Sequence, residues 1–218
     1  MKKATHDLNI QREPIQGRSR ASLNRMLTAA EKLLGESGSD DFTLADVSEA
    51  GKVSIGSIYN RFDSKDELLY AVHARVLAKV DDDMNAALEK AIAKATDLNS
   101  HVNGVIYSVS EVLRKYASIL RPFMMRSLRD SRIAEAGKQG YEATEQKVLD
   151  SFAPYLKEIR HSNTDKAIIS SYRIVYAAVA RYLGFGSESM GLGSGGWKTL
   201  KDDLAVMWTA YLTYPKAK

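Results

Sequence analysis

The side chains that could catalyse a reaction are scattered along this sequence. The chain of 218 residues has no cysteine, which excludes a thiol nucleophile, a disulfide framework and cysteine-ligated metal sites. The positions of serine, histidine and acidic residues do not indicate a hydrolytic triad. The four histidines stand far apart, with no partner at ligand spacing, at His6, His73, His101 and His161. We therefore expect a protein that is not an enzyme and that needs neither a metal ion nor a cofactor.

Binding to a DNA groove is the chemistry indicated by residues 43–69. Thr43, with Asp46 three residues later, forms a helix-capping pattern, and Ser54 can cap a second short helix. A tight turn over residues 51–53 would join the two helices into a helix-turn-helix. The outer face of the second helix carries residues that fit a major groove without steric conflict: Ile55, Gly56, Ser57 and Asn60.

A longer motif surrounds these helices. It comprises Val53-Ser54, Gly56-Ser57-Ile58-Tyr59, Phe62, Ser64-Lys65 and Leu68-Leu69, preceded by Ala29-Ala30, Leu33-Leu34, Phe42-Thr43 and Asp46-Val47. At these offsets the sequence resembles TetR-type (tetracycline repressor-like) transcriptional regulators. Lys52 departs from the family pattern, which usually has glycine there, so we expect either a left-handed lysine or a shifted turn.

The resemblance implies an all-α fold with two parts. A three-helix domain containing the helix-turn-helix would precede a helical domain that binds an effector and dimerises. The expected division is a flexible basic arm at 1–18, a DNA-binding domain at 19–63 and an effector-binding and dimerisation domain at 64–218. By the same resemblance, Ile55, Gly56 and Ser57 would approach base edges. The phosphate contacts would be Thr43, Tyr59, Asn60 and Lys65.

The N-terminal arm is a second candidate for contact with DNA. Residues 1–25 hold six basic residues against two acidic ones, although the whole chain carries a formal charge of only +4. Arg18 and Arg20, with Arg12, could reach phosphates or a minor groove. The alternative is a solvated tail.

Apolar residues at helical spacing predict further helices along the remaining chain. An effector pocket could be lined by Tyr107, Tyr116, Phe123, Met124, Tyr141, Phe152, Tyr172 and Tyr176, or these residues could be ordinary core. A dimer interface could use Tyr172, Val175, Val179, Leu204, Trp208 and Tyr211, or some of these could pack only within their own subunit. The expected helices span about residues 20–34, 64–80, 81–96, 101–120, 122–160 (with Pro154 ending or kinking it), 165–184 and 197–213, with a glycine-rich loop at 184–196.

The sequence as a whole favours a ligand-responsive transcriptional regulator. We expect a homodimeric repressor that binds a near-palindromic double-stranded operator and is released by a small organic effector. The absence of a targeting segment or a long apolar run favours the cytoplasm and no membrane partner. The alternative is a helical small-molecule-binding protein or enzyme that merely contains a helix-turn-helix.

Overall fold

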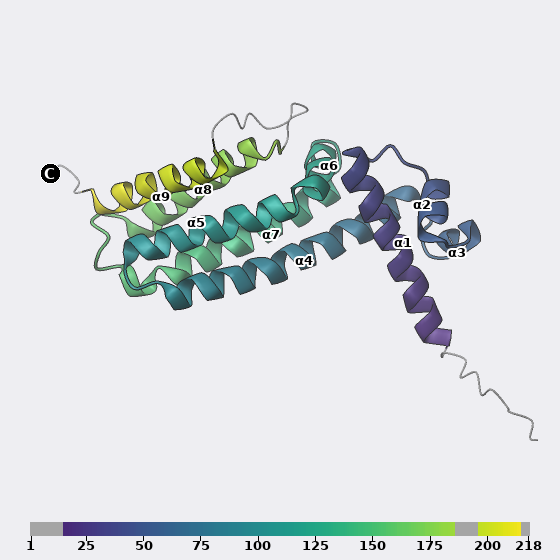
Figure 1. The fold of residues 1–218 in the computed structure, drawn as a ribbon, viewed down its shortest axis with the longest axis horizontal. Helices are drawn as coiled ribbons and strands as arrows, with labels where there is room; N and C mark the ends of the chain where they lie inside the picture. Colours follow the sequence, from purple (N-terminus) through teal and green to yellow (C-terminus); the bar gives the residue numbers. More distant parts are fainter. Residues whose placement is uncertain (1–14, 186–195, 215–218) are drawn as a thin grey trace, which may run out of the picture.

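A computed structural model describes residues 15–185 and 196–214 of the chain (Figure 1). In these ranges the regular secondary structure consists of nine α-helices and one short 3-10 helix, with no strand. The all-α fold expected from the sequence is confirmed. None of the helices in the described ranges is long and apolar enough to cross a membrane.

The first three helices form a compact unit at one end of the molecule (Figure 1). They are α1 (Ile15–Ser37), α2 (Leu44–Gly51) and α3 (Ile55–Tyr59). Their apolar faces meet around Met26, Val47 and Ile58, which are fully buried. Gly51 allows α2 to pack closely on α1, because a Cβ there would lie 3.2 Å from the backbone oxygen of Arg25.

Helix α4 (Lys65–Lys94) is a single helix of 30 residues that joins this unit to the rest of the molecule. The sequence predicted two helices that divide near Asp81, and this boundary is wrong. No proline or glycine interrupts the segment, and the buried stripe continues across the boundary from Val76 and Val80 to Met84. One rigid element therefore connects the two ends of the molecule.

Two of the remaining helices, α5 (Leu98–Lys115) and α7 (Ser131–Ser151), pack along α4, and α8 (Thr164–Tyr182) and α9 (Trp197–Thr213) cover their other side (Figure 1). The expected helix at 101–120 is divided at Tyr116, whose hydroxyl donates to Asp83 on α4, and Pro122 lies inside the next helix instead of starting it. Pro154 follows the end of α7 in the 3-10 helix, as predicted. Residues 186–195 of the expected glycine-rich loop lie outside the described residues. The helix bounds are α5 (Leu98–Lys115), α6 (Ala117–Ser127), α7 (Ser131–Ser151), η1 (Ala153–Tyr155), α8 (Thr164–Tyr182) and α9 (Trp197–Thr213).

Candidate nucleic-acid interface and buried cavity

Hydrogen-bonding caps fix the starts of both helices of the helix-turn-helix. The Thr43 hydroxyl accepts from the backbone N–H of Asp46 at 3.2 Å, and the Asp46 carboxylate accepts from the Thr43 N–H at 2.6 Å. These hydrogen bonds hold the pKa of the Asp46 carboxyl below its usual value. Ser54 accepts from the N–H of Ser57 at 3.2 Å. Both caps were predicted from residue types and spacing, and both are confirmed.

The turn between α2 and α3 keeps its lysine in a left-handed conformation. Lys52 has φ 49° and ψ 49°, and it is the one non-glycine residue with positive φ in the described ranges. The next residue is anchored to α2, because the Val53 N–H donates to the Ser48 carbonyl and the Ser48 hydroxyl donates to the Val53 carbonyl. The structure thus adopts the first of the two turn geometries that the sequence left open.

Helix α3 divides its residues between the core and the outer surface. Ile58 and Phe62 face inward. On the outer side, Ile55 is 41% exposed and Tyr59 is 58% exposed. Gly56 meets open space, Asn60 is exposed and Ser57 is half-buried. Of the residues predicted to contact bases and phosphates, Ile55, Gly56, Tyr59 and Asn60 are therefore accessible, and Ser57 is partly so.

Two basic residues near this surface form hydrogen bonds within the N-terminal unit. The Lys65 ammonium donates to the backbone carbonyl of Asp40 and lies 4.9 Å from the centre of the Phe42 ring. The Arg61 guanidinium donates to the carbonyl and hydroxyl oxygens of Ser19 at 2.8 and 2.6 Å. Lys65 is thus already engaged, and Arg61 ties the end of α3 to the start of α1.

The basic arm expected at 1–18 is shorter than predicted. Helix α1 already begins at Ile15, so Arg18 and Arg20 are exposed residues of a helix. The remainder of the expected arm, residues 1–14 with Arg12, lies outside the described residues.

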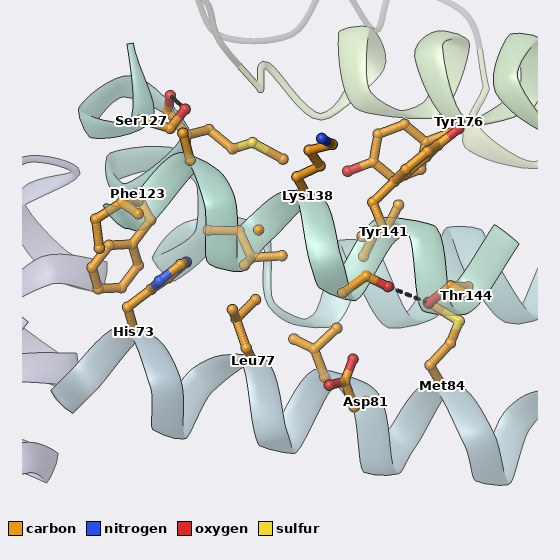
Figure 2. A pocket seen from close by; sticks show the side chains of 18 of the residues that line it. His73, Leu77, Asp81, Met84, Phe123, Ser127, Lys138, Tyr141, Thr144 and Tyr176 are labelled. Atoms are coloured by element: carbon orange, nitrogen blue, oxygen red, sulfur yellow. Dashed lines mark hydrogen bonds between the residues drawn. The ribbon is translucent and has the colours of Figure 1, made fainter. Parts of the chain in front are cut away.

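A cavity of about 380 Å³ lies between α4, α6, α7 and α8, with Leu113 from α5 in its wall (Figure 2). Its lining is mostly apolar. Five of the eight residues that the sequence proposed for a pocket are in this lining: Phe123, Met124, Tyr141, Tyr172 and Tyr176.

The other three proposed pocket residues do not line the cavity. The Tyr107 hydroxyl donates to Asp202 at 2.6 Å, and the Tyr116 hydroxyl donates to Asp83 at 2.7 Å. Phe152 is fully buried elsewhere in the core, where its ring packs against His101 and Trp208. Helical spacing placed these aromatic residues on inward faces but could not indicate which inward face borders the cavity.

His73 is a cavity residue that the sequence did not single out. It occupies the buried stripe of α4, is only 5% exposed, and its ring centre lies 4.6 Å from that of Phe123. Burial lowers the pKa of His73 to about 4, against a smaller opposing effect of Asp130. The imidazole is therefore neutral at pH 7. A histidine in an otherwise apolar helical stripe was the available signal.

Three tyrosine rings form a cluster on another side of the cavity. The ring centre of Tyr141 lies 5.7 Å from that of Tyr172 and 4.7 Å from that of Tyr176. The Tyr141 hydroxyl donates to Glu145 at 3.0 Å. Burial, followed by this hydrogen bond, raises the pKa of Tyr141 to about 12, so the phenol is uncharged.

Arg126 on α6 holds the N-terminal unit against the helices of the cavity. Its guanidinium donates to Asp40 at 2.6 Å, to Asp66 at 2.8 Å and to Asp130 at 2.9 Å. Asp40 precedes α2, Asp66 is in the first turn of α4, and Asp130 caps α7. Burial would lower the pKa of Arg126, but these hydrogen bonds outweigh that effect and raise it. We call these four residues the Arg126 junction.

The comparisons with known proteins agree with this architecture. Residues 26–72 match the family model described as bacterial regulatory proteins, tetR family. The chain therefore has the N-terminal domain and the fold of the TetR family. This domain and fold indicate regulation of transcription through DNA binding. A search of curated proteins found no match.

Several solved structures are similar to this chain over most of its length. Their sequence identity to it is low, so they show a shared fold alone. A putative TetR-family transcriptional regulator from Mesorhizobium loti MAFF303099 is 14% identical with a TM-score of 0.71, covering 89% of this chain and 96% of that one. Salmonella enterica GusR is 19% identical with a TM-score of 0.65, covering 94% and 99%. A putative transcriptional regulator from Saccharomonospora viridis, solved in complex with choline, is 14% identical with a TM-score of 0.65, covering 89% and 97%.

The residues proposed for a TetR-type dimer interface are mostly inside the subunit. The buried ones are Tyr172, Val175, Val179, Leu204 and Trp208, whereas Tyr211 is 43% exposed. A side chain buried in its own subunit cannot contact a second one, so the five buried residues are reassigned to the core. The same two helices expose other large apolar residues, namely Ile174 on α8 and Val206 and Met207 on α9.

In the part of the chain that the structure describes, no group of three or more histidine or acidic side chains lies close enough together to hold a metal ion. Arg126 and Arg129 both pair with Asp40.

Proposed function

We propose that the protein is a homodimeric transcriptional repressor that binds a near-palindromic operator and is released by a small-molecule effector. The observation that carries the proposal is the connection, through α4, of a TetR-type helix-turn-helix to a separate, largely apolar cavity. We propose residues 19–63 as the DNA-binding domain and 64–218 as the effector-binding and dimerisation domain. As a regulator of transcription, it would act in the cytoplasm.

The DNA contacts that we propose lie on the exposed surface of α3. Ile55, Gly56 and Ser57 are at its N-terminal end, where a reading helix meets base edges in the major groove. Tyr59, Asn60 and Thr43 would contact phosphates. The engaged Lys65 would act through its charge, whereas Arg18 and Arg20, which are exposed on α1, would add further phosphate contacts.

The dimer interface that we propose is the exposed apolar face of α8 and α9. Ile174 is 60% exposed, Val206 69% and Met207 62%, and Tyr211 lies one turn beyond Met207. Exposed apolar residues that gather on neighbouring helices favour contact with another protein surface. A two-fold dimer would place two reading helices in successive major grooves about 34–36 Å apart.

The effector would act on DNA binding through the Arg126 junction. Phe123 lies in the cavity wall three residues before Arg126, and Ile133 lies in it three residues after Asp130. A ligand that displaces α6 or the start of α7 would therefore strain the contacts of Arg126 with Asp40 and Asp66. Release from DNA requires the ligand to bind this altered state more tightly than the DNA-bound state.

The first experiment selects an operator from random double-stranded DNA with the full-length protein. We then expect Tyr59→Ala to weaken binding to all sequences and Ser57→Ala to change the sequence preference. Lys90→Ala, an exposed residue near the far end of α4, is the control. If no sequence is enriched, or if Tyr59→Ala binds as the wild type does, the proposed DNA surface is wrong.

A further inference from the structure

The residues that line the cavity determine whether the central part of a ligand should be polar or apolar. The aliphatic and thioether part of the lining is contributed by Leu77, Val80 and Met84 on α4, Leu113 on α5 and Ile133 on α7. Four of these five side chains are buried, so a ligand inside would be enclosed on several sides. Such walls favour an apolar ligand body, because each apolar group removed from water contributes to binding.

One side of the cavity presents the imidazole of His73 (Figure 2). Neither ring nitrogen has a hydrogen-bond partner among the described residues, although the side chain is almost fully buried. A neutral imidazole offers one donor and one acceptor. Buried polar groups are normally hydrogen-bonded, so this side of the cavity is suited to a polar atom of a ligand.

The opposite side presents tyrosine hydroxyls. Figure 2 shows Tyr141 and Tyr176 across the cavity from His73 and Phe123. The Tyr141 hydroxyl is engaged by Glu145, but those of Tyr172 and Tyr176 have no hydrogen-bond partner among the described residues. Tyr172 is only 1% exposed. The cavity therefore has hydrogen-bonding groups on two opposite sides of an apolar middle.

Two charged residues contribute to the lining, Asp81 and Lys138. Asp81 and Lys138 are both exposed, and Lys138 faces Glu142 at 3.8 Å. The enclosed polar groups are the neutral imidazole of His73 and the uncharged phenols of the tyrosine cluster. A charged ligand would lose its hydration inside without gaining a buried counter-charge, which is unfavourable.

We propose that the cavity takes an uncharged, elongated, largely aromatic molecule with a hydrogen-bonding group at each end. One end would bind the imidazole of His73, and the other would bind the hydroxyls of Tyr172 and Tyr176. The aromatic body would lie against Phe123 and the tyrosine rings. This inference rests on the proposed function in one respect, because it assigns the cavity to the effector.

Calorimetry on the full-length protein tests the ligand class with three probes. These are 4,4′-dihydroxybiphenyl, which is neutral with two polar ends, biphenyl, which lacks polar ends, and biphenyl-4,4′-dicarboxylate, which is charged. We expect the dihydroxy compound to bind most tightly, biphenyl about tenfold more weakly, and the dicarboxylate about a hundredfold more weakly. Tighter binding of the dicarboxylate, or no binding of any probe, would overturn the proposal.

Substitutions that remove single polar groups test which residues bind the two ends of the ligand. Tyr172→Phe and Tyr176→Phe remove one hydroxyl each, and His73→Phe removes the imidazole nitrogens. Each should weaken dihydroxybiphenyl about tenfold while leaving biphenyl unchanged. Tyr107→Phe is the matched control, because Tyr107 lies outside the cavity. Wild-type affinity in all three cavity variants would refute the assignment, and the two tyrosine variants decide it if His73→Phe does not fold.

A separate readout distinguishes this inference from the proposed function. Operator binding is measured by fluorescence anisotropy with and without dihydroxybiphenyl. If the probe binds in the cavity with the expected variant effects but leaves operator binding unchanged, the ligand class is supported and the effector role fails. If the protein binds no operator at all, the repressor proposal fails and the calorimetry still decides the ligand class.

Discussion

The helix-turn-helix and the cavity differ in how their polar groups are satisfied. In the helix-turn-helix, the side chains of Thr43, Asp46 and Ser54 all hydrogen-bond within a few residues along the chain. In the cavity, His73, Tyr172 and Tyr176 come from helices far apart in sequence and have no hydrogen-bond partner in the described part of the chain. A surface held by local hydrogen bonds is already rigid before it meets DNA. The cavity instead presents polar groups that a ligand can satisfy.

The Arg126 junction should carry the largest energetic effect, because it joins the two regions. Replacing Arg126, which is 12% exposed, with alanine leaves the partly buried Asp130 without its cation and leaves Asp40 with only the exposed Arg129. We expect the free energy of unfolding to fall by about 3 kcal/mol. Urea denaturation measures this loss, with Lys32→Ala as the control from the exposed pair Lys32–Glu36, where a change under about 0.5 kcal/mol is expected. Equal effects of the two substitutions would show that the junction does not hold the regions together.

Buried histidines should make the cavity-bearing helices sensitive to acid. Burial lowers the pKa of His73, and that of His101, to about 4 in the folded protein, below the ordinary histidine value of 6.5. The unfolded chain then binds more protons between these values, so stability is fully present above pH 6.5 and is lost as pH falls toward 4. Each histidine should contribute a loss of about 2–3 kcal/mol.

Urea denaturation of His73→Gln between pH 4 and 7.5 checks this expectation. The variant should lose part of the pH dependence, and His73→Gln combined with His101→Gln should lose more of it. The measured quantity is the change of the free energy of unfolding with pH, so a loss of stability that is equal at every pH does not interfere. An unchanged slope in the double variant would contradict the neutral state of both rings.

Gly51 tests how closely the helix-turn-helix depends on its local packing. A Cβ at this position would lie 3.2 Å from the backbone oxygen of Arg25 and 3.3 Å from the Cβ of Ala29. Gly51→Ala should therefore destabilise the protein by about 1–2 kcal/mol while leaving probe binding in the cavity unchanged. Gly56→Ala, where nothing lies within 4 Å of the added Cβ, is the control for stability. A loss of probe affinity in Gly51→Ala would show that the two regions are less independent than their contacts indicate.

Lys52 should give the smallest effect, and one of opposite sign. Its left-handed backbone is strained for a residue with a Cβ, so Lys52→Gly should stabilise the protein by about 0.5–1 kcal/mol. Lys52→Ala removes the same charge but keeps the strain, and it should not stabilise. Thermal unfolding compares the two variants. A similar melting temperature for both would mean that the turn stores no backbone strain.

The sequence was most informative where structure is determined locally. Caps at Thr43 and Ser54 and the tight turn lie within a few residues of each other, so residue types alone indicated the caps and the position of the turn, and they left only two geometries open for Lys52. The break at Tyr116 depends instead on a contact with a distant helix, because its hydroxyl donates to Asp83 on α4, and local spacing could not predict it. The continuity of α4 across Asp81 was indicated by the unbroken spacing of Val76, Val80 and Met84, which the sequence interpretation missed.

Periodicity also could not distinguish two kinds of apolar face. Val175 and Ile174 are neighbours on α8, yet the first is buried in its own subunit and the second is 60% exposed. Consecutive residues point about 100° apart around a helix, so spacing separates their two faces but does not say which one packs within the subunit. The packing of α8 against neighbouring helices decides this. The same limit explains why Tyr141 lines the cavity whereas Tyr107 does not.

The length of α4 restricts how the gene for this protein can change. Its 30 residues span about 45 Å at 1.5 Å per residue, and the helix contributes to both regions of the molecule. A single inserted codon between Val72 and Val80 would rotate everything beyond it by about 100° relative to the DNA-binding helices. Point substitutions in α7 and α8 do not change this rotational relationship between the two regions. New ligand preferences can therefore arise by substitution there, whereas a change in the length of α4 would disrupt both regions at once.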